Sequence, residues 1–280
     1  MTEKTKMKFF KIFLIFGAGL IIFFAIYLSN YFSDSTPISN PSPFEKSANG
    51  QVFLPTIASD IIKTDTPILM YHHIRINPDP NSQLETSLNV SPDNFEKQMN
   101  YFYQAGWQTI FLDNLFTTAG QKNFIITFDD GYRDVIQNAY PILEKFGFKA
   151  TIFLIVNKIG QEGYLSWDDI FQLQSRGWSF GSHTLNHQNL VALNQAEAEN
   201  EIIQSKKILD WALAKPVTFF CYPIGKFNQK IIKIVEEAGY AGAVTTLSGR
   251  ENSAANIYQL KRVRVSGPDS LERIKEKLES

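Results

Sequence analysis

From residue 66 onward, short apolar runs alternate with segments of helical periodicity, and this alternation restricts the fold more than any other feature. Each run has the length of a strand, and turn or cap residues separate it from the next segment. The expected strands cover residues 68–72, 109–112, 124–128, 151–156, 178–182, 217–222, 241–245 and 260–265. Such an order is typical of an α/β domain with a parallel sheet, because parallel neighbours need a long crossover that a helix can provide.

Cap residues place helices between these strands. Ser91-Pro92 supplies an N-cap followed by proline at the first helical position. Ser166 with Asp169 three residues later resembles a capping box, and a further helix is expected over 194–213. The roughly 210 residues of this region suffice for a compact barrel, and an open doubly wound sheet is the alternative. In either fold, polar residues at the carboxyl ends of the strands mark the functional site.

The N-terminus carries an apolar feature of another kind. Residues 12–28 contain no charge and follow four lysines, so we expect one transmembrane helix there. The positive-inside rule then places residues 1–11 in the cytoplasm, with 29–65, rich in Ser, Asn and Pro, as a flexible stalk to a domain over 66–280. The expected location is the cell membrane, with a single pass and the domain outside the cytoplasm. A cleaved signal peptide, which would give a secreted domain, and a buried core helix are the alternatives.

Composition excludes several classes of function. The formal net charge is −1, and the lysines near the N-terminus leave the rest of the chain mildly acidic. Nucleic acid is therefore not an expected partner, because its recognition normally needs a basic face. The single cysteine, Cys221, cannot form an internal disulfide, and no G-x-S-x-G nucleophile elbow is present.

Two adjacent carboxylates, Asp129 and Asp130, follow the apolar run FIITF. Like charges at this spacing repel each other, and a bound cation would offset that cost. The alternative is an ordinary polar turn, since Asp-Gly pairs are common in turns.

The chain has four histidines, in two pairs that each follow an expected strand: His72 and His73, and His183 and His187. Imidazoles four residues apart can reach one metal from a tight loop, although such pairs also occur on ordinary surface loops. With Asp130, the second pair would offer two nitrogens and one oxygen and leave a position for water, as in catalytic zinc sites. The same ligands suit non-haem iron(II) oxygenases. A second carboxylate that acts as base, with a histidine across the site as acid, favours hydrolysis.

The motifs TFDDG at 127–131 and HTLNH at 183–187 resemble the two leading motifs of the polysaccharide deacetylases, the NodB-like carbohydrate esterase family 4. Other segments are similar to its extracellular poly-N-acetylglucosamine deacetylase branch: ILMYHHI, SPDNFEKQM, LSWDDI and CYPIG. The resemblance runs from about residue 67 to 265. It implies a distorted (β/α) barrel of seven or eight strands that removes N-acetyl groups from an N-acetylglucosamine polymer with a divalent metal. Zinc is the default, with cobalt or nickel as alternatives.

The resemblance also implies roles for individual residues. Asp129 is the expected general base, and Asp130, His183 and His187 are the expected metal ligands. The metal would polarise the acetyl carbonyl and bind the attacking water, and the backbone N–H of Ile224 would help to stabilise the oxyanion.

The catalytic acid is where the sequence first departs from the family. Many members carry it in a Leu-x-His motif near the C-terminus, but no histidine follows His187. In the branch with a YH motif on the first strand, the early histidine takes this role. We therefore assign it to His72, with His73 as the alternative, and expect the other of the two to be a core histidine bonded to backbone.

Cys221 and Ile224 are two further departures. Cys221 stands where many relatives have an arginine that orients the base, so we expect Arg262, or alternatively Arg264, to supply that charge to Asp129. Cys221 itself is expected to be a small buried hydrophobe rather than a nucleophile. Ile224 replaces the usual tyrosine, which keeps the backbone donor and loses a side chain for sugar binding.

Three aromatic residues near the motifs are candidates for stacking on sugar rings: Tyr132, Trp167 and Tyr222. Core or rim packing is the alternative for each. The sequence thus predicts a membrane-anchored, metal-dependent N-deacetylase whose partner is an N-acetylated extracellular glycan, either an exopolysaccharide or peptidoglycan. The rival interpretations are a non-catalytic glycan-binding protein on a decayed deacetylase domain, and an O-acetyl esterase or other amide hydrolase.

Overall fold

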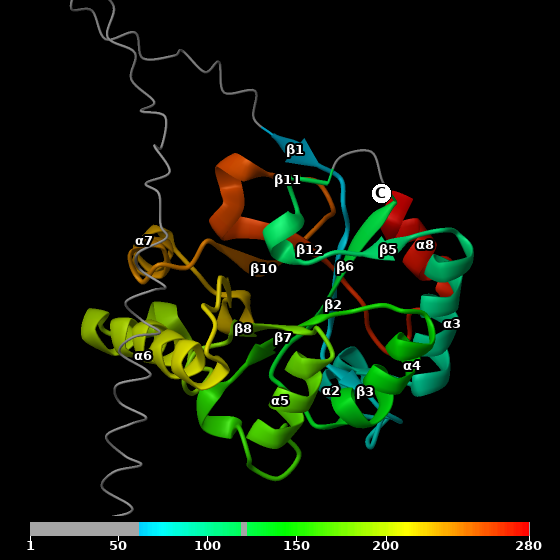
Figure 1. Cartoon of the computed structure of the whole chain (residues 1–280), viewed down its shortest axis with the longest axis horizontal. Helices are drawn as coiled ribbons and strands as arrows, with labels where there is room; N and C mark the ends of the chain where they lie inside the picture. Colours follow the sequence, from blue (N-terminus) through cyan, green and yellow to red (C-terminus); the bar gives the residue numbers. More distant parts are fainter. Residues whose placement is uncertain (1–61, 119–121, 280) are drawn as a thin grey trace, which may run out of the picture. The chain divides into compact units, whose positions relative to one another are not determined.

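The computed structural model describes residues 62–118 and 122–279. Seven of its strands form one closed barrel: β2 (Ile68–Tyr71), β6 (Asn123–Phe128), β7 (Thr151–Leu154), β8 (Ser179–Ser182), β9 (Phe219–Cys221), β10 (Gly242–Ser248) and β12 (Leu260–Arg264). Their order around the barrel is β2, β12, β10, β9, β8, β7 and β6, and β6 pairs with β2 to close the ring (Figure 1). Every one of these pairings is parallel. The expected α/β barrel is therefore confirmed, with seven strands, and the open sheet is excluded.

The expected strand over 109–112 does not become part of the ring. β5 (Gln108–Thr109) pairs only with the first two residues of β6, and β2 takes over along the same side of β6 from Ile125 onward. The chain then turns through a short 3-10 helix, η1 (Leu112–Asn114). Because β2 already supplies the pairing that closes the barrel, β5 remains a short peripheral strand.

Two small sheets lie beside the barrel. β3 (His73–Ile74) pairs with β4 (Asn89–Val90), and β1 (Lys63–Thr64) pairs with β11 (Asn252–Ser253). The paired β1 belongs to the folded domain, which therefore includes residues just before the expected boundary at 66. The expected transmembrane segment 12–28, the basic segment 1–11 and the stalk up to residue 61 lie outside the described residues. No helix within the described ranges has the length and apolar character needed to cross a membrane.

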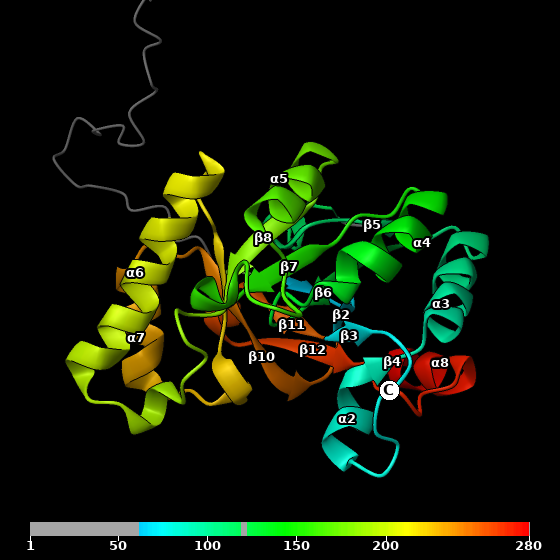
Figure 2. The same cartoon turned by 90° about the horizontal axis from the view of Figure 1, so that it is seen from below.

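Helices surround the barrel strands in both views (Figures 1 and 2): α2 (Gln83–Leu88), α3 (Pro92–Gln104), α4 (Tyr140–Lys145), α5 (Trp167–Ser175), α6 (Gln195–Leu213), α7 (Gln229–Glu237) and α8 (Leu271–Glu279), with a π-helical turn η2 (Val135–Ala139) before α4. The caps expected from the sequence are present. The side chains of Ser91 and Ser166 each accept a backbone N–H three residues later, and Asp169 completes the second capping box. A third helix begins at the N-cap Asn194, as expected. These local bonds satisfy N–H groups that would otherwise lack partners at a helix start.

Apolar side chains form two clusters on opposite sides of the barrel wall. Successive residues of a strand face opposite ways, so Leu69, Phe220 and Val263 pack outward against the helices. Their neighbours Ile68, Phe219 and Leu260 fill the barrel interior. This alternation decides which residues at the carboxyl ends of the strands face the mouth of the barrel.

Candidate active site

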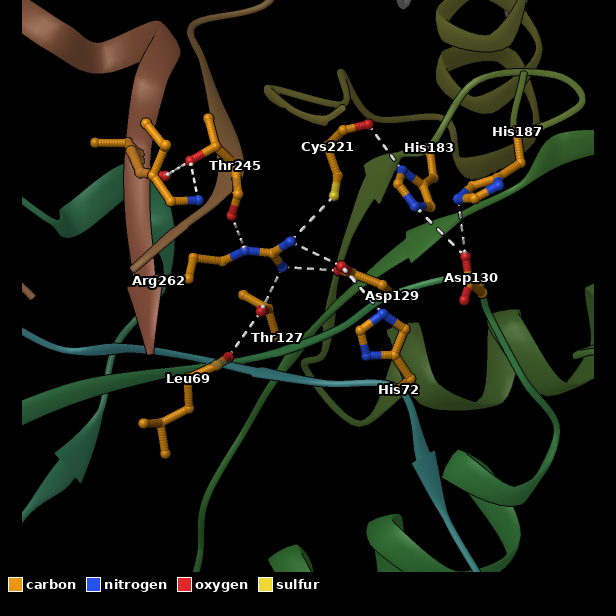
Figure 3. A network of polar contacts seen from close by, with 12 residues as sticks. Leu69, His72, Thr127, Asp129, Asp130, His183, His187, Cys221, Thr245 and Arg262 are labelled. Atoms are coloured by element: carbon orange, nitrogen blue, oxygen red, sulfur yellow. Dashed lines mark hydrogen bonds and ion pairs between the residues drawn. The ribbon is translucent and has the colours of Figure 1, made fainter. Parts of the chain in front are cut away.

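The inward positions at the carboxyl ends of five strands bring the chemically active side chains together (Figure 3). Each lies in, or one residue beyond, a barrel strand, at a position of the same parity as an inner-core or inward residue of that strand: His72, Asp129, His183, Cys221 and Arg262. All five are buried, with 0–8% of their surface exposed. The alternation of the strands thus assembles, in one place, residues that lie up to 190 positions apart in the sequence.

Arg262 and Asp129 form the most complete interaction of the site. The Nη1 and Nη2 groups of Arg262 each donate to one carboxylate oxygen of Asp129 at 2.7 Å, which is a bidentate pair. Burial alone would raise the pKa of Asp129, but the charge and hydrogen bonds of Arg262 outweigh it and hold that pKa well below its ordinary value. Asp129 is therefore an ionised, oriented carboxylate inside the protein.

The guanidinium is itself held by the barrel wall. Its Nε donates to the carbonyl of Thr245 at 2.8 Å, and Nη1 also donates to the hydroxyl of Thr127 at 3.0 Å. Nη2 lies 3.4 Å from Cys221 Sγ, so the small cysteine side chain leaves room for the arginine that crosses from β12. Burial raises the pKa of the Cys221 thiol, in keeping with a neutral packing residue. Arg264, the alternative candidate, makes no bond to Asp129 among the described residues.

Asp130, His183 and His187 form the second part of the site. Their ligand atoms all lie within 4.8 Å of one another. Oδ1 of Asp130 is 3.4 Å from Nε2 of His183 and 3.5 Å from Nε2 of His187, yet it is buried and has no hydrogen-bond partner among the described residues. A buried oxygen without a partner, facing two imidazole nitrogens, fits a divalent cation better than a set of hydrogen bonds, so these residues are able to hold a metal.

A second group of potential ligands, Asp129, His183 and Cys221, also lies close together. Arg262 already supplies its positive charge, because the guanidinium contacts both oxygens of Asp129 and the sulfur of Cys221. The two adjacent aspartates are thus compensated in different ways: Asp129 by an arginine of the protein, and Asp130 by a position that suits a cation.

Strained backbone accompanies these side chains. Four of the five non-glycine residues with positive φ in the described ranges are Asp130, Thr184, His187 and Ile224. This conformation is unfavourable for residues with a Cβ and is held in place at functional sites by the surrounding structure. At the histidine loop, the His187 N–H donates to the hydroxyl of Thr184 at 2.9 Å and stabilises the turn.

The structure distinguishes the two neighbouring histidines of the first strand. Nε2 of His72 lies 3.9 Å from Oδ2 of Asp129, and its buried Nδ1 has no partner among the described residues. His73 instead binds Oδ2 of Asp134 through Nδ1 at 2.5 Å and stacks on Tyr132. His72 therefore faces the site, and His73 is the structural member of the pair, although its partner is a carboxylate rather than the expected backbone group.

The imidazoles differ in their protonation. Burial lowers the pKa of His72 to about 4, although Asp129 and Asp130 act in the opposite direction. Burial and the nearby His183 lower the pKa of His187. For His183, burial would also lower the pKa, but the contacts with Cys221 and Asp130 outweigh it and raise the pKa well above its ordinary value in the metal-free protein.

Ile224 lies in the loop after β9, in a 3-10 turn over Pro223–Gly225. It adopts φ 50° and ψ 15°, a conformation that a β-branched residue rarely occupies. Its side chain is 55% exposed, and its N–H has no acceptor within the part of the chain that the structure describes. The turn therefore leaves a backbone donor free, at the cost of local strain.

The three aromatic candidates have different surroundings. Tyr132 is half-buried beside the site, where burial and the charge of Asp130 raise its pKa, so its hydroxyl is protonated. Trp167 is half-buried, packs against the outer core and stacks on Phe171. For Tyr222 the expectation of sugar stacking is wrong. Its side chain points outward, is 1% exposed and donates to the carbonyl of Tyr258.

Sequence reasoning missed two residues that support the site. Asp134 holds both the ring of His73 and the N–H of Ile74, and Thr127 links Arg262 to the carbonyl of Leu69. Thr127 lies in the TFDDG motif and faces inward with Asp129, so strand alternation was a usable signal. Nothing local marks Asp134, because its partners lie about 60 residues earlier in the chain.

An arginine-clamped carboxylate beside an Asp-His-His group at the mouth of a parallel barrel defines the protein as an α/β barrel with an ionised carboxylate next to a site able to hold a metal. Comparisons with known proteins narrow this class. The family model for polysaccharide deacetylase matches residues 117–243. Bacillus subtilis YxkH, classed with the polysaccharide deacetylases, is 37% identical over 215 residues, which cover 73% of this chain and 74% of YxkH. The chain belongs to the polysaccharide deacetylase family.

Two further proteins are similar to this chain. The poly-beta-1,6-N-acetyl-D-glucosamine N-deacetylase of Staphylococcus aureus (strain MRSA252) is 26% identical over 196 residues, 63% of this chain and 68% of the relative. The Streptococcus pyogenes deacetylase PplD, solved in complex with acetate, superposes with a TM-score of 0.71 at 30% identity. That match covers 79% of this chain and all of PplD.

Proposed function

We propose that this protein removes N-acetyl groups from an extracellular polysaccharide that contains N-acetylglucosamine. The observation that carries the proposal is the ionised Asp129, held by both nitrogens of Arg262 next to the Asp130, His183 and His187 group. A hydrolase needs a base in the correct protonation state beside the position where water is activated, and this arrangement provides both. The acetate in the structure of PplD is the acid that deacetylation releases.

The reaction requires that water attack the acetyl carbonyl, that the C–N bond break, and that the amine leave with a proton. Asp129 takes the proton of the attacking water, and Arg262 keeps the carboxylate ionised and fixed in direction. The free N–H of Ile224 donates to the oxyanion. His72 is neutral before the reaction, because burial lowers its pKa to about 4, so it takes up a proton before it gives one to the departing amine. Its Nε2 lies 3.9 Å from Oδ2 of Asp129, the carboxylate that gains the proton of water. When held by Asp130, His183 and His187, a divalent metal supplies Lewis-acid polarisation of the carbonyl and lowers the pKa of water. Zinc suits this set of two nitrogens and one oxygen, with cobalt or nickel as alternatives.

Two observations favour catalysis over a glycan-binding role on a decayed domain. The cysteine at 221 removes one arginine, but Arg262 reaches the same carboxylate from β12. The isoleucine at 224 removes a tyrosine side chain, but the backbone donor is free and preformed. The site therefore keeps both the arginine contact to the base and the backbone donor despite these two departures from the family pattern.

The experiment is acetate release by the full-length protein from N-acetylglucosamine oligomers, with and without a chelator. We expect release that stops with chelator, returns on adding zinc, cobalt or nickel, and is lost in Asp129→Asn. Asp113→Asn, a change far from the site in η1, serves as the matched control. Glycan binding without release in any metal-loaded sample would contradict the proposal. O-acetylated glycans and peptidoglycan fragments in the same assay separate the alternative substrates.

We further propose that residues 12–28 anchor the protein in the membrane with the catalytic domain outside the cytoplasm. The uncharged length of this segment and the lysines before it support the proposal. Protease added to intact cells should degrade the domain and leave a short membrane-bound fragment. A domain protected in intact cells would contradict the orientation, and release of the whole domain into the medium would indicate signal cleavage.

A further inference from the structure

The loop that carries His183 and His187 is held from outside the barrel by a buried carboxylate. Glu201 lies on α6 and is only 4% exposed. Its Oε2 accepts the backbone N–H of Asn186 at 2.9 Å, and its Oε1 accepts the side-chain N–H of the same residue at 2.6 Å. Both carboxylate oxygens thus bind the residue immediately before His187.

The two imidazoles of the candidate metal group are anchored in different ways. Nδ1 of His183 donates to the carbonyl of Cys221 at 2.8 Å, and its side chain is 3% exposed. The side chain of His187 is 29% exposed, and its second ring nitrogen has no acceptor in the described ranges. Metal-binding histidines are normally oriented by a bond to that second nitrogen. The direction of His187 must therefore come from the backbone of the loop.

The remaining contacts of Asn186 leave it one orientation. Its Oδ1 accepts from Nδ2 of Asn157 at 2.8 Å, in the loop after β7. The N–H groups of Val156 and Asn157 donate to the carbonyls of Thr184 and Leu185. With the amide oxygen engaged by Asn157, only the amide nitrogen can face Glu201, and that nitrogen requires an acceptor.

A purely structural role would not explain why the residue at position 201 is a buried carboxylate. No cationic side chain pairs with it in the part of the chain that the structure describes, and burying a carboxylate without a cation costs free energy. A glutamine would be cheaper to bury but could not accept both N–H groups of Asn186, because one of its two terminal atoms is a donor.

We propose that Glu201 is a positioning residue for the metal site: it fixes Asn186, and through it the direction of His187, and so sets the affinity for the divalent cation. The inference rests on the metal-dependent function proposed above. It assigns to α6, a helix outside the barrel, a role in the chemistry at the mouth.

The test is zinc affinity, measured by competition with a chromophoric chelator on the full-length protein, together with the visible absorption spectrum of the cobalt form. We expect Glu201→Gln to weaken zinc binding about 10- to 100-fold, the range for residues that orient metal ligands, and to change the cobalt spectrum. Glu197→Gln is the matched control, because Glu197 lies on the same helix but binds only the N-cap backbone at Asn194. It should leave both readouts unchanged.

A rescue variant distinguishes positioning from general damage. In Asn186→Asp with Glu201→Gln, donor and acceptor are exchanged: the new amide donates to the new carboxylate, its oxygen accepts the backbone N–H, and Asn157 keeps its acceptor. Asn186→Asp alone places two carboxylates face to face and should weaken zinc binding. The double variant should bind zinc more tightly than either single variant, a non-additivity that a purely additive loss of stability would not give.

Circular dichroism and thermal unfolding of the metal-free proteins test whether each variant is folded. A folded Glu201→Gln with the affinity and cobalt spectrum of the wild type would overturn the inference. If the single variant does not fold, a folded double variant no tighter than Asn186→Asp would overturn it equally. Wild-type protein that binds no divalent metal would instead refute the proposed function, and the role of Glu201 with it.

Discussion

The two halves of the site, built from adjacent aspartates, are completed in opposite ways. Asp129 has both oxygens bonded to Arg262, and that guanidinium is in turn bonded to the barrel wall. Asp130 keeps a buried oxygen without a hydrogen bond, opposite two imidazole nitrogens at 3.4 and 3.5 Å. The first half is preorganised by the protein alone, whereas the second is left for a cation to complete. Two aspartates that are adjacent in the sequence can therefore be suited to different roles, one to that of a base and the other to that of a metal ligand, because their partners differ.

The largest effect on activity is expected when the two aspartates are replaced one at a time. Asp129→Asn should lower kcat about 100- to 10,000-fold, the range for loss of a general base, while zinc affinity stays near the wild-type value. Asp130→Asn should lose zinc affinity and activity together. Chelator competition and acetate release on both variants test the contrast. Equal loss of zinc binding in the two variants would show that the carboxylates act as one unit.

Removing Arg262 should reverse the direction in which the pKa of Asp129 is shifted. In Arg262→Met, only the weaker effects of His72 and His183 still oppose burial, so the pKa of Asp129 should rise above its unfolded value. Activity at neutral pH should fall, and it should recover toward high pH. The variant should be about 3 to 5 kcal/mol less stable at neutral pH, because it leaves a buried charge unpaired.

The contribution of Asp129 to stability should change with pH in opposite directions in the wild type and in Arg262→Met. In the wild type the lowered pKa of Asp129 contributes stability above the unfolded pKa of about 4, and this contribution is lost as the pH falls. In Arg262→Met the pKa is raised, so the deficit relative to wild type should grow as the pH rises from about 4. Urea unfolding of the metal-free proteins at several pH values measures the difference. Arg264→Met, two residues along β12, is the control. Its deficit should depend much less on pH, because Arg264 makes no bond to Asp129 and affects the site through its charge near His72.

His72 and His73 are adjacent, but their replacement should affect different properties of the protein. His72→Gln should lower kcat about 100-fold or more, because the proton donor for the amine is lost, with a smaller change in KM. His73→Gln should act mainly on stability, since that ring is bonded to Asp134 and stacked on Tyr132. Steady-state kinetics and thermal unfolding of the two variants, side by side, separate these effects. The assignment of the acid to His72 fails if His73→Gln has the larger effect on kcat.

The smallest effect is expected at Ile224, whose backbone is strained and also supplies the proposed oxyanion donor. Ile224→Gly relieves a positive φ that costs an L-residue roughly 1–2 kcal/mol and adds about 0.5–1 kcal/mol of backbone entropy on unfolding. The net gain in the free energy of unfolding should be at most about 1.5 kcal/mol. Activity should change only a few-fold, because the donor is the N–H. A loss of activity comparable to that of Asp129→Asn would mean that the side chain takes part.

The class of fold and most of the chemically active residues of the site could be predicted from the sequence. Alternating apolar runs and caps at Ser91 and Ser166 are local features, so a parallel α/β fold and two of its helix starts could be predicted from neighbouring residues alone. The closure of the sheet into a barrel was implied only by the resemblance to the family. Asp130, His183 and His187 could be predicted as a group because strand ends in such folds meet at one edge. The short β1 and β11 could not, because a two-residue strand has no period of its own and exists only through its partner.

Contacts between distant parts of the chain select among the alternatives that the local sequence leaves open. Arg262 and Arg264 are alike in sequence, and only the path of β12 across from β6 places the first against Asp129. Tyr222 follows Cys221, and the direction of the strand sends one side chain to the outer core and the other to the site. Asp134 and Glu201 act on residues 61 and 15 positions away. Contacts of this kind depend on distances in three dimensions, which neither periodicity nor a motif along the chain encodes.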